Sequence, residues 1–414
     1  MILLHMLEIA EDVLRRCQAM GEFSDESGAV TRTFLSAAMR SCHLYLSDWM
    51  KHLGMSVQVD AAGNLRGLYP GSCAARKRLV IGSHLDTVPD AGLYDGVLGV
   101  VWGLALVAAM RGARLPFAIE VIGFSEEEGV RFGAPFIGSR AVAGTLDEQL
   151  LQTCDSSGIS VAQAMSDFGL DLSRLPEAAL DPSAAAYLEL HIEQGPVLES
   201  LRLPVATVDG IAGQSRAAVT FTGRPNHAGT TPMPLRRDAL CAAAEWILSV
   251  EHEARLTDGL VATVGRIEAR PGAGNVIPGD VRASLDVRHS DDAVCYSAFA
   301  NLLAKGESIA HQRGLTFNKQ IILDQRAVPM HGGLTDLIKK AIAATGITPH
   351  EITSGAGHDA MILAPRLPCG MIFVRCPGGI SHHPSETVQL SDVAVALRAG
   401  LHLLQNLSQC PLLT

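Results

Sequence analysis

Residues 78–99 read RLVIGSHLDTVPDAGLYDGVLG, and this stretch decides the fold. The apolar run Arg78 to Ile81 ends at Gly82-Ser83, which predicts a short strand that leads into a loop. The run from Val97 to Met110 is rich in Ala, Val, Leu and Gly and predicts a buried helix. A strand, a polar loop and a helix in this order are typical of an α/β sheet with parallel strands.

Further apolar runs predict strands at residues 117–124, 187–192 and 370–374. Apolar residues at 3.6-residue spacing predict amphipathic helices at residues 5–20 and 30–54. We therefore expect a doubly wound, mostly parallel sheet with helices on both faces. In such sheets ligands bind beyond the carboxyl ends of the strands.

The middle of the chain has a different pattern. It predicts, in order, strand 216–222, helix 235–253, strands 260–268 and 281–288, helix 291–312 and strand 316–323. The order βαββαβ is that of a ferredoxin-like unit. Because the α/β pattern resumes near Gly332, we expect a catalytic domain of residues 1–211 and 326–414, with residues 212–325 inserted into it.

Composition excludes several classes of function. The 414 residues include 33 Lys and Arg against 43 Asp and Glu, and a net charge of −10 argues against a nucleic-acid surface. No apolar run is long enough to span a bilayer, and Glu8 and Glu11 come too early for a signal peptide. The nine Cys are scattered and form no CxxC, so we expect reduced thiols in a cytoplasmic protein.

Imidazoles and carboxylates recur after the predicted strands, at His84, Asp95, Glu128, His191 and His382. A single His after a strand is usually a polar loop residue, but five such residues together predict a site for two divalent ions. A natural division places His84 and His191 on one ion, Glu128 and His382 on the other, and Asp95 between them. Two ions about 3.5–4 Å apart suit hydrolysis by a bridging hydroxide.

Two carboxylates beside these ligands have predicted roles in the same chemistry. Asp86 follows His84 closely enough to accept its second imidazole N–H and fix the tautomer, although it also fits a turn residue. Glu127 would deprotonate the attacking water and pass the proton to the leaving nitrogen. Taken alone, Glu126-Glu127-Glu128 also fits a solvated charge run.

Four further residues are candidates for contact with substrate. His227, in a loop crowded with hydrogen-bond donors, would stabilise an oxyanion, and Gln194 would read an amide or carbamoyl group. Arg288, at a predicted strand end, would bind a carboxylate, and Asn275 can donate and accept hydrogen bonds. Taken alone, Asn275 fits a turn residue and Arg288 an exposed strand end.

The motifs together resemble the peptidase M20 superfamily. They are Gly82-Ser83-His84-Leu85-Asp86-Thr87-Val88, Glu127-Glu128-Gly129-Val130-Arg131-Phe132, Glu189-Leu190-His191-Ile192-Glu193-Gln194-Gly195-Pro196, Asn226-His227-Ala228-Gly229-Thr230-Thr231-Pro232-Met233, Asn275-Val276-Ile277-Pro278-Gly279 and Gly379-Ile380-Ser381-His382. More narrowly they look like its hydantoinase/carbamoylase branch, which holds N-carbamoyl-L-amino-acid hydrolases, allantoate amidohydrolases and β-ureidopropionases. The Ser354–Ala360 stretch resembles the corresponding sequence of allantoate amidohydrolases, and carbamoylases can have a similar sequence there.

The resemblance implies a two-domain homodimer with a dinuclear site and Glu127 as general base. It implies that Gln194, His227, Asn275 and Arg288 hold the ureido and carboxylate groups, and that the inserted domain is a dimerising lid. The family motif selects His382 over His383 as the ligand, because the ligand directly follows Ser. The ions would be Zn or Mn, with Co or Ni also accepted by such ligands.

The expected function is that of a binuclear metal-dependent amidohydrolase. It would cleave the ureido or carbamoyl C–N bond of a small carboxylate, either allantoate or an N-carbamoyl-L-amino acid. An aminopeptidase or dipeptidase with the same metal centre is the alternative, and a protein with purely structural metals is a third reading. The sequence leaves open the roles of Arg236, Arg237, His358 and His383.

Overall fold

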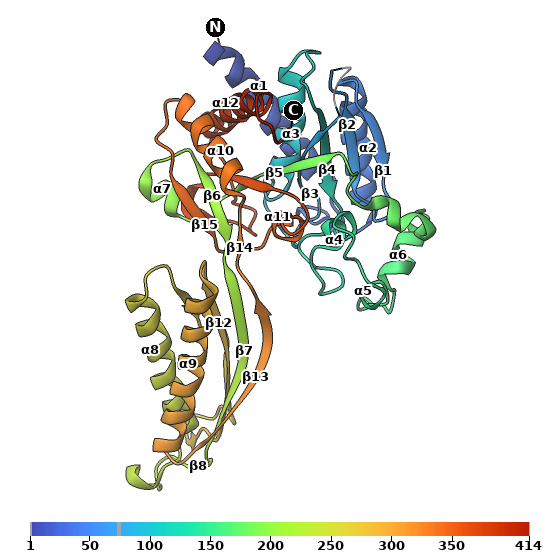
Figure 1. The fold of residues 1–414 in the computed structure, drawn as a ribbon. Helices are drawn as coiled ribbons and strands as arrows, with labels where there is room; N and C mark the ends of the chain where they lie inside the picture. Colours follow the sequence, from blue (N-terminus) through green and yellow to red (C-terminus); the bar gives the residue numbers. More distant parts are fainter. Residues whose placement is uncertain (1, 73–75, 414) are drawn as a thin grey trace. The chain divides into compact units, whose positions relative to one another are not determined.

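The computed structural model describes residues 2–72 and 76–413, so Cys73 lies outside the described residues. The chain divides into two compact units, one of Met1–Asp209 with Met330–Thr414 and one of Gly210–Pro329. Figure 1 shows the elements of both units.

The larger sheet has the strand order β1-β2-β4-β3-β5-β16-β6-β14, and β15 pairs with β6. Its strands are β1 (Ser56–Val59), β2 (Leu65–Tyr69), β3 (Arg78–His84), β4 (Ala118–Phe124), β5 (Ala184–Ile192), β6 (Val205–Ile211), β14 (Val328–Pro329), β15 (Glu351–Ser354) and β16 (Cys369–Val374). The central strands β4, β3, β5 and β16 are parallel. The flanking pairs are antiparallel, so the sheet is mixed with a parallel centre.

Helices cover both faces of this sheet. They are α1 (Ile2–Gly21), α2 (Ala37–His52), α3 (Val97–Ala109), α4 (Ile137–Val142), α5 (Glu148–Leu151), α6 (Val161–Asp167), α7 (Val197–Leu201), α10 (Gly332–Ala344), α11 (Asp359–Leu363) and α12 (Leu390–Leu407), with 3₁₀ turns η1 (Leu172–Ala178) and η3 (Pro377–Gly379). Helices α1, α3, α10 and α12 pack together on one side (Figure 1), and α11 packs against β5 and β16. Along β5, Leu188 and Leu190 belong to the main apolar core, so Glu189 and His191 point to the opposite face.

Helix α3 packs unusually close to the centre of the sheet. All its residues from Val97 to Val107 are buried. A Cβ at Gly99 would lie 2.2 Å from the backbone oxygen of Leu190, so only glycine permits this approach. The tight contact places the first turn of α3, directly after Asp95, beside the end of β5 that contains His191.

Two predicted element boundaries are wrong. The helix expected at residues 30–54 begins at Ala37, where the Ser36 side chain accepts from the Met39 N–H and Leu35 has a φ of 52°. The strand expected at residues 260–268 is divided into β9 (Val261–Thr263) and β10 (Ile267–Arg270), which both pair with β12. Between them Arg266 donates its N–H to the Ser284 side chain, so the ladder is interrupted locally.

The second unit contains a five-stranded antiparallel sheet of order β10-β12-β7-β13, with β9 paired to β12. Its other elements are β7 (Gly213–Thr222), β8 (Asn226–His227), η2 (Met233–Leu235), α8 (Ala239–Leu256), β11 (Val276–Ile277), β12 (Asp280–His289), α9 (Asp292–Gln312) and β13 (Thr316–Gln325). Helices α8 and α9 pack on this sheet around the buried Trp246 and Phe221. The unit therefore has an apolar core of its own.

Within residues 2–72 and 76–413, seven cysteines are not cross-linked. Cys17, Cys42, Cys154, Cys241, Cys295, Cys369 and Cys376 are free thiols. Burial raises the pKa of the Cys17 and Cys369 thiols, which keeps both protonated. Separately, no helix within residues 2–72 and 76–413 combines the length and the apolar character that a membrane crossing requires.

Candidate metal centre

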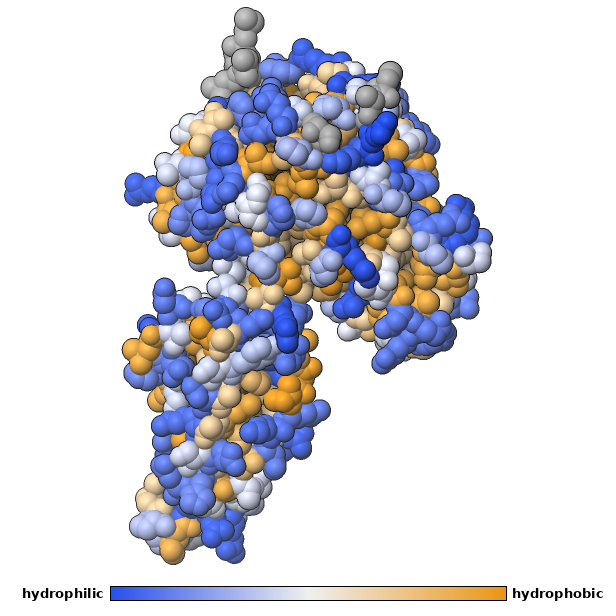
Figure 2. All heavy atoms as spheres, in the orientation of Figure 1, coloured by the Kyte–Doolittle hydropathy of each residue, from blue (hydrophilic) through white to orange (hydrophobic). Residues whose placement is uncertain are grey.

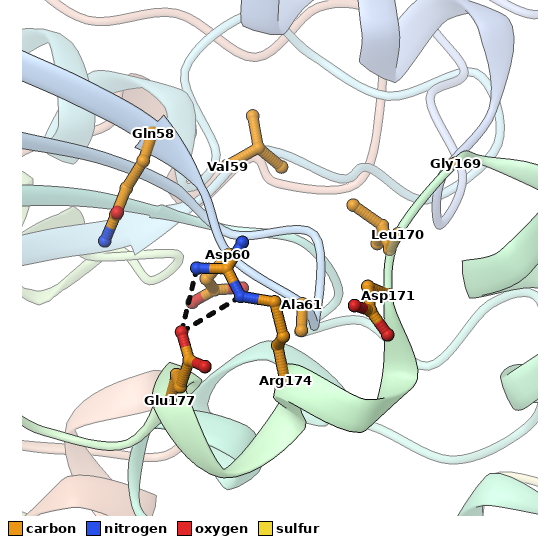
Figure 3. Close-up of a pocket in the computed structure, with 9 residues that line it drawn as sticks. All are labelled: Gln58, Val59, Asp60, Ala61, Gly169, Leu170, Asp171, Arg174 and Glu177. Atoms are coloured by element: carbon orange, nitrogen blue, oxygen red, sulfur yellow. Dashed lines mark hydrogen bonds and ion pairs between the residues drawn. The ribbon is translucent and has the colours of Figure 1, made fainter.

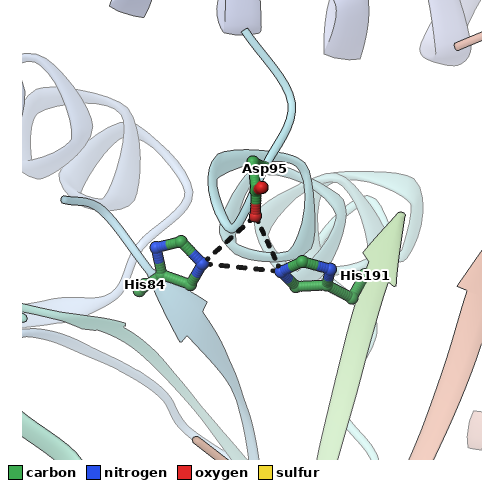
Figure 4. A group of neighbouring side chains, drawn as sticks. All are labelled: His84, Asp95 and His191. Carbon is green, nitrogen blue, oxygen red and sulfur yellow. Dashed lines mark hydrogen bonds and ion pairs between the residues drawn. The ribbon is translucent and has the colours of Figure 1, made fainter. Parts of the chain in front are cut away.

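His84, Asp95 and His191 converge at the carboxyl ends of the parallel strands (Figure 4). His84 is the last residue of β3, His191 lies near the end of β5, and Asp95 directly precedes α3. The Oδ1 atom of Asp95 lies 3.1 Å from His191 Nε2 and 3.4 Å from His84 Nε2. All three side chains are almost fully buried.

The backbone fixes which imidazole nitrogens face this centre. His84 Nδ1 lies 3.0 Å from the backbone oxygen of Asp86, and His191 Nδ1 lies 3.0 Å from that of Ile192. A carbonyl accepts a hydrogen bond only from a protonated nitrogen, so Nδ1 carries the proton in both neutral rings. The lone pairs of both Nε2 atoms, which are 3.4 Å apart, then point at the same place as Asp95.

A second group forms around the other oxygen of Asp95. His382 Nε2 lies 3.3 Å from Asp95 Oδ2 and 3.4 Å from Glu128 Oε1. A third overlapping group joins His84 with Glu127 and Glu128. The five residues that the sequence nominates as ligands therefore come together, with Asp95 common to two groups as expected for a shared carboxylate.

Asp86 organises the acidic segment that follows β4. Its Oδ1 accepts the backbone N–H of Glu127 at 2.9 Å, and its Oδ2 accepts that of Glu128 at 3.0 Å. The Asp86 carboxylate is also 3.5 Å from His84 Nδ1, farther than its own backbone oxygen. The carboxylate thus holds the Glu127–Glu128 loop, while the carbonyl is the nearer acceptor for the ring.

The solvated charge run, the alternative for Glu126-Glu127-Glu128, is wrong. Glu126 is completely buried and Glu127 is 8 % exposed. Burial raises the pKa of Glu127 well above its usual value, and burial together with the Asp86 charge does the same for Glu126. Side chains that lose this much solvation are retained only where another interaction compensates.

The residues present fit divalent cations. Asp95 Oδ1 is buried and, despite the two nearby imidazoles, accepts no hydrogen bond of good geometry. Burial alone would lower the pKa of His84, but its interactions with Asp86 and Asp95 raise that pKa well above the usual value. Carboxylate oxygens and imidazole nitrogens at this spacing are the donor set of borderline and hard divalent ions.

The sequence did not predict the contacts that Ser381, Gln194 and His358 make with the proposed ligands. Ser381 donates its hydroxyl to Asp95 Oδ2 at 2.6 Å, and Gln194 donates to the same oxygen at 2.9 Å. The buried His358 ring lies 4.4 Å from the His191 ring, centroid to centroid, and its Nε2 is 2.9 Å from Ser354 Oγ. The contacts of Ser381 and Gln194 with Asp95, and of His358 with His191, join segments far apart in the chain, so local sequence patterns do not predict them.

The remaining candidates lie in the second unit. His227, in β8, and Asn275, directly before β11, lie close together, since β8 pairs with β11 and the Ala228 N–H donates to the Asn275 carbonyl at 2.9 Å. Arg236 supports the His227 loop by donating to the carbonyls of Thr231 and Ala228 at 3.0 and 2.5 Å. Arg288 donates from Nε to Asp286 at 2.8 Å. The structure thus brings His227 and Asn275 together within this unit.

A polar hollow of about 190 Å³ lies elsewhere in the first unit, between β1 and η1 (Figure 3). Its ionic groups already have partners: Arg174 pairs with Glu177, and Asp60 accepts from Asn64 and Ala62. None of the proposed ligands lines it. It has no part in the metal centre.

The fold and this centre define an α/β protein with a candidate divalent-metal site. A profile described as Peptidase family M20/M25/M40 matches residues 80–406. An N-carbamoyl-L-amino acid amidohydrolase of Geobacillus stearothermophilus is 40% identical over 96% of this chain and 98% of its own. A probable allantoate deiminase of Oryza sativa subsp. japonica is 38% identical over 97% of this chain and 88% of its own.

Solved structures give the same assignment. An amidase of the hydantoinase/carbamoylase family from Burkholderia multivorans superposes with a TM-score of 0.92 at 32% identity, covering 97% of this chain and 98% of that one. The chain therefore belongs to peptidase family M20/M25/M40, and it is a hydrolase of amide C–N bonds.

Proposed function

We propose that the chain is a binuclear metal-dependent amidohydrolase that cleaves the ureido or carbamoyl C–N bond of a small carboxylate. The substrate is allantoate or an N-carbamoyl-L-amino acid, as the names of its relatives indicate. The observation that supports this most is the shared position of Asp95, which joins the His84–His191 pair to the Glu128–His382 pair.

The proposed ions are Zn or Mn, with Co or Ni also compatible with the donor set. When bound, two such ions supply Lewis acidity and a water of lowered pKa. The ligands are His84, Asp95, Glu128, His191 and His382. Their preformed grouping, in which His84, Asp95 and His191 are buried, supports this assignment, because little side-chain reordering is needed to receive the ions.

Glu127 is the proposed general base. It is adjacent in the chain to the proposed ligand Glu128. Its backbone N–H donates to the Asp86 carboxylate, which fixes the position from which the Glu127 side chain extends. Glu127 takes a proton from the attacking water onto a carboxylate oxygen and returns it to the leaving nitrogen. The products are ammonia and carbon dioxide together with the amine-bearing fragment.

Substrate recognition is assigned to Gln194, His227, Asn275 and Arg288. Gln194 forms hydrogen bonds with the ureido group, His227 stabilises the developing oxyanion, and Arg288 binds the substrate carboxylate. The Gln194 amide oxygen is buried without a hydrogen-bond partner, which supports a role for this side chain toward a donor group of the ligand.

Residues 212–325 form, in this proposal, an inserted ferredoxin-like domain that serves as a lid and joins two copies of the chain into a homodimer. The strand and helix order β7-α8-β9-β12-α9-β13 supports the ferredoxin-like assignment. Hydrophobic atoms are visible on the surface of this unit (Figure 2). Leu248, Leu256, Ile321 and Ile322 are among its exposed apolar side chains, which supports a protein interface. The proposed compartment is the cytoplasm, which the free thiols support.

The test is a substrate panel with matched variants. Purified protein loaded with Mn or Zn is assayed for ammonia release from allantoate and from N-carbamoyl-L-amino acids, with dipeptides as the competing class. Turnover of a ureide above that of any dipeptide is expected. Faster dipeptide cleavage would favour the peptidase alternative, and no turnover of metal-loaded protein would refute the substrate assignment.

Two isosteric variants separate chemistry from metal binding. Glu127→Gln is expected to keep both ions and lose activity by roughly 10²- to 10⁴-fold, the range for loss of a general base. Glu128→Gln is expected to lose metal as well, because it removes a ligand charge. Full activity of Glu127→Gln would contradict the assignment, whereas loss of activity with metal and fold retained would exclude a purely structural role for the ions.

A further inference from the structure

Glu386 is a buried carboxylate next to the metal centre that none of the proposed catalytic steps uses. It is 4 % exposed, and its hydrogen-bond partners are two backbone N–H groups and one hydroxyl, none of them cationic. Burying a carboxylate without a cationic partner costs free energy. Its contacts therefore indicate what compensates for that cost.

The first contact fixes the backbone of Asp95. Glu386 Oε1 accepts the N–H of Tyr94 at 2.8 Å and the N–H of Asp95 at 3.0 Å. These two successive amides lie just ahead of Gly96, the N-cap of helix α3 (Val97–Ala109), whose positive amino-terminal end favours a carboxylate. Gly92 allows the approach, since a Cβ there would lie 2.4 Å from the Glu386 side chain.

The second contact involves the Asp95 side chain. Ser381 donates its hydroxyl to Asp95 Oδ2 at 2.6 Å, and the same hydroxyl lies 3.4 Å from Glu386 Oε2. The Glu386 N–H donates to the His383 carbonyl at 3.0 Å, which closes a turn directly after His382. The segment from Ser381 to Glu386 thus contains one proposed ligand and holds another at both its backbone and its side chain.

We infer that Glu386 is a positioning residue that sets the separation of Asp95 and His382, and through it the affinity for the ion held by Asp95, Glu128 and His382. This inference rests on the proposed function. The pair His84 and His191 lies on β3 and β5, whose register is fixed by the sheet, so the other ion depends less on Glu386.

The inference predicts an uneven loss of metal. Metal-free wild-type protein titrated with Mn²⁺ or Zn²⁺ is expected to take up two ions per chain, measured by elemental analysis and by competition with a chelator. Glu386→Ala is expected to keep one ion and to bind the second roughly 10- to 100-fold more weakly, the usual effect of losing a support behind a ligand. Glu386→Gln is expected to restore most of that affinity, because its amide oxygen can accept both N–H groups.

A matched control tests whether removing any carboxylate that accepts two backbone N–H groups near a helix start would also weaken metal binding. Asp291, the N-cap of α9, also accepts two successive amides, those of Ala293 at 2.7 Å and Val294 at 3.3 Å in the first turn of the helix, but its unit contains no proposed metal ligand. Asp291→Ala is expected to leave both metal affinities at wild-type values. A merely structural role for Glu386 would lower the stability of the metal-free protein without separating the two ions.

The metal affinities of the Glu386 variants decide whether Glu386 positions the ligands of one ion. The inference is overturned if Glu386→Ala binds both ions with wild-type affinity. It is also overturned if the variant loses the same amount of affinity for each ion. If Glu386→Ala does not fold, Glu386→Asp is used, because it keeps the charge and withdraws the oxygens from the two N–H groups. Wild-type metal binding in Glu386→Asp likewise overturns the inference. Failure of the wild-type protein to bind metal refutes the proposed function instead.

Discussion

The Oδ1 atom of Asp86 accepts the backbone N–H of Glu127 at 2.9 Å, which ties the loop after β3 to the loop after β4. The partner oxygen does the same for Glu128. One buried carboxylate thus fixes the backbone of both the proposed base and a proposed ligand. Both side chains reach the centre from this common support, with carboxylate oxygens within 4.8 Å of each other and of a His84 ring nitrogen.

Loss of this support is expected to lower activity even though Asp86 is neither a proposed metal ligand nor the proposed base. Asp86→Ala should reduce kcat/KM by roughly 10²-fold, because both amides lose their acceptor. Asp86→Asn keeps one acceptor oxygen and should lose roughly 10-fold. Steady-state kinetics of ammonia release check this, with Asp171→Asn, an exposed turn carboxylate that accepts from Ser173, as the control. Wild-type kinetics for Asp86→Ala would contradict it.

Metal removal is expected to destabilise the first unit. Asp95 and Glu128 are held close together, and without cations their repulsion remains. Metal at 100 times its Kd should raise the free energy of unfolding by about 2.7 kcal/mol per site. Urea denaturation with and without a chelator measures the difference. An identical midpoint in both conditions would show that the ions do not bind the folded chain selectively.

His43 is expected to make stability depend on pH. Burial, with the nearby charges of Arg32 and Arg40, lowers the pKa of His43 from 6.5 to about 4, so the folded protein holds the ring neutral. The unfolded chain binds the proton below pH 6.5, and stability therefore falls as the pH drops from 6.5 toward 4. The loss between pH 7 and pH 5 should be about 2 kcal/mol.

The substitution His43→Phe isolates this contribution. Neither ring nitrogen of His43 has a hydrogen-bond partner, and the ring packs edge-on to Phe168, so an apolar ring should fit. Urea denaturation at pH 5 and pH 7 should show a difference for the variant smaller by about 2 kcal/mol than for the wild type. Equal pH dependence in the two proteins would place the titration elsewhere.

Gly99→Ala is expected to destabilise the fold next to His191. The added methyl meets the Leu190 carbonyl at 2.2 Å, and neither α3 nor β5 can move without disturbing the core. A loss of about 3 kcal/mol in the free energy of unfolding is expected from such overpacking. Gly332→Ala, at a site with open space, should change it by less than about 0.5 kcal/mol. A Gly99→Ala variant as stable as wild type would contradict the close packing.

Most strands and helices, and the residues proposed for the chemistry, could be predicted from the order of amino acids alone. Apolar periodicity located β3, α3, β4, β5 and β16, because burial imposes a period that is visible in the residues themselves. The same local patterns nominated His84, Asp95, Glu128, His191 and His382, since the ends of parallel strands meet at one edge of a sheet. The structure brings these five side chains together.

Only the tertiary structure decided how those side chains are supported. The acceptor roles of Asp86 and Glu386, the burial of Glu126 and the antiparallel flanks of the sheet all depend on contacts between distant segments. Glu386 and Asp95 are 291 positions apart, and no local period records such a meeting. A hydrogen bond between distant residues forms where packing happens to place its donor and acceptor, and that placement belongs to the folded chain as a whole.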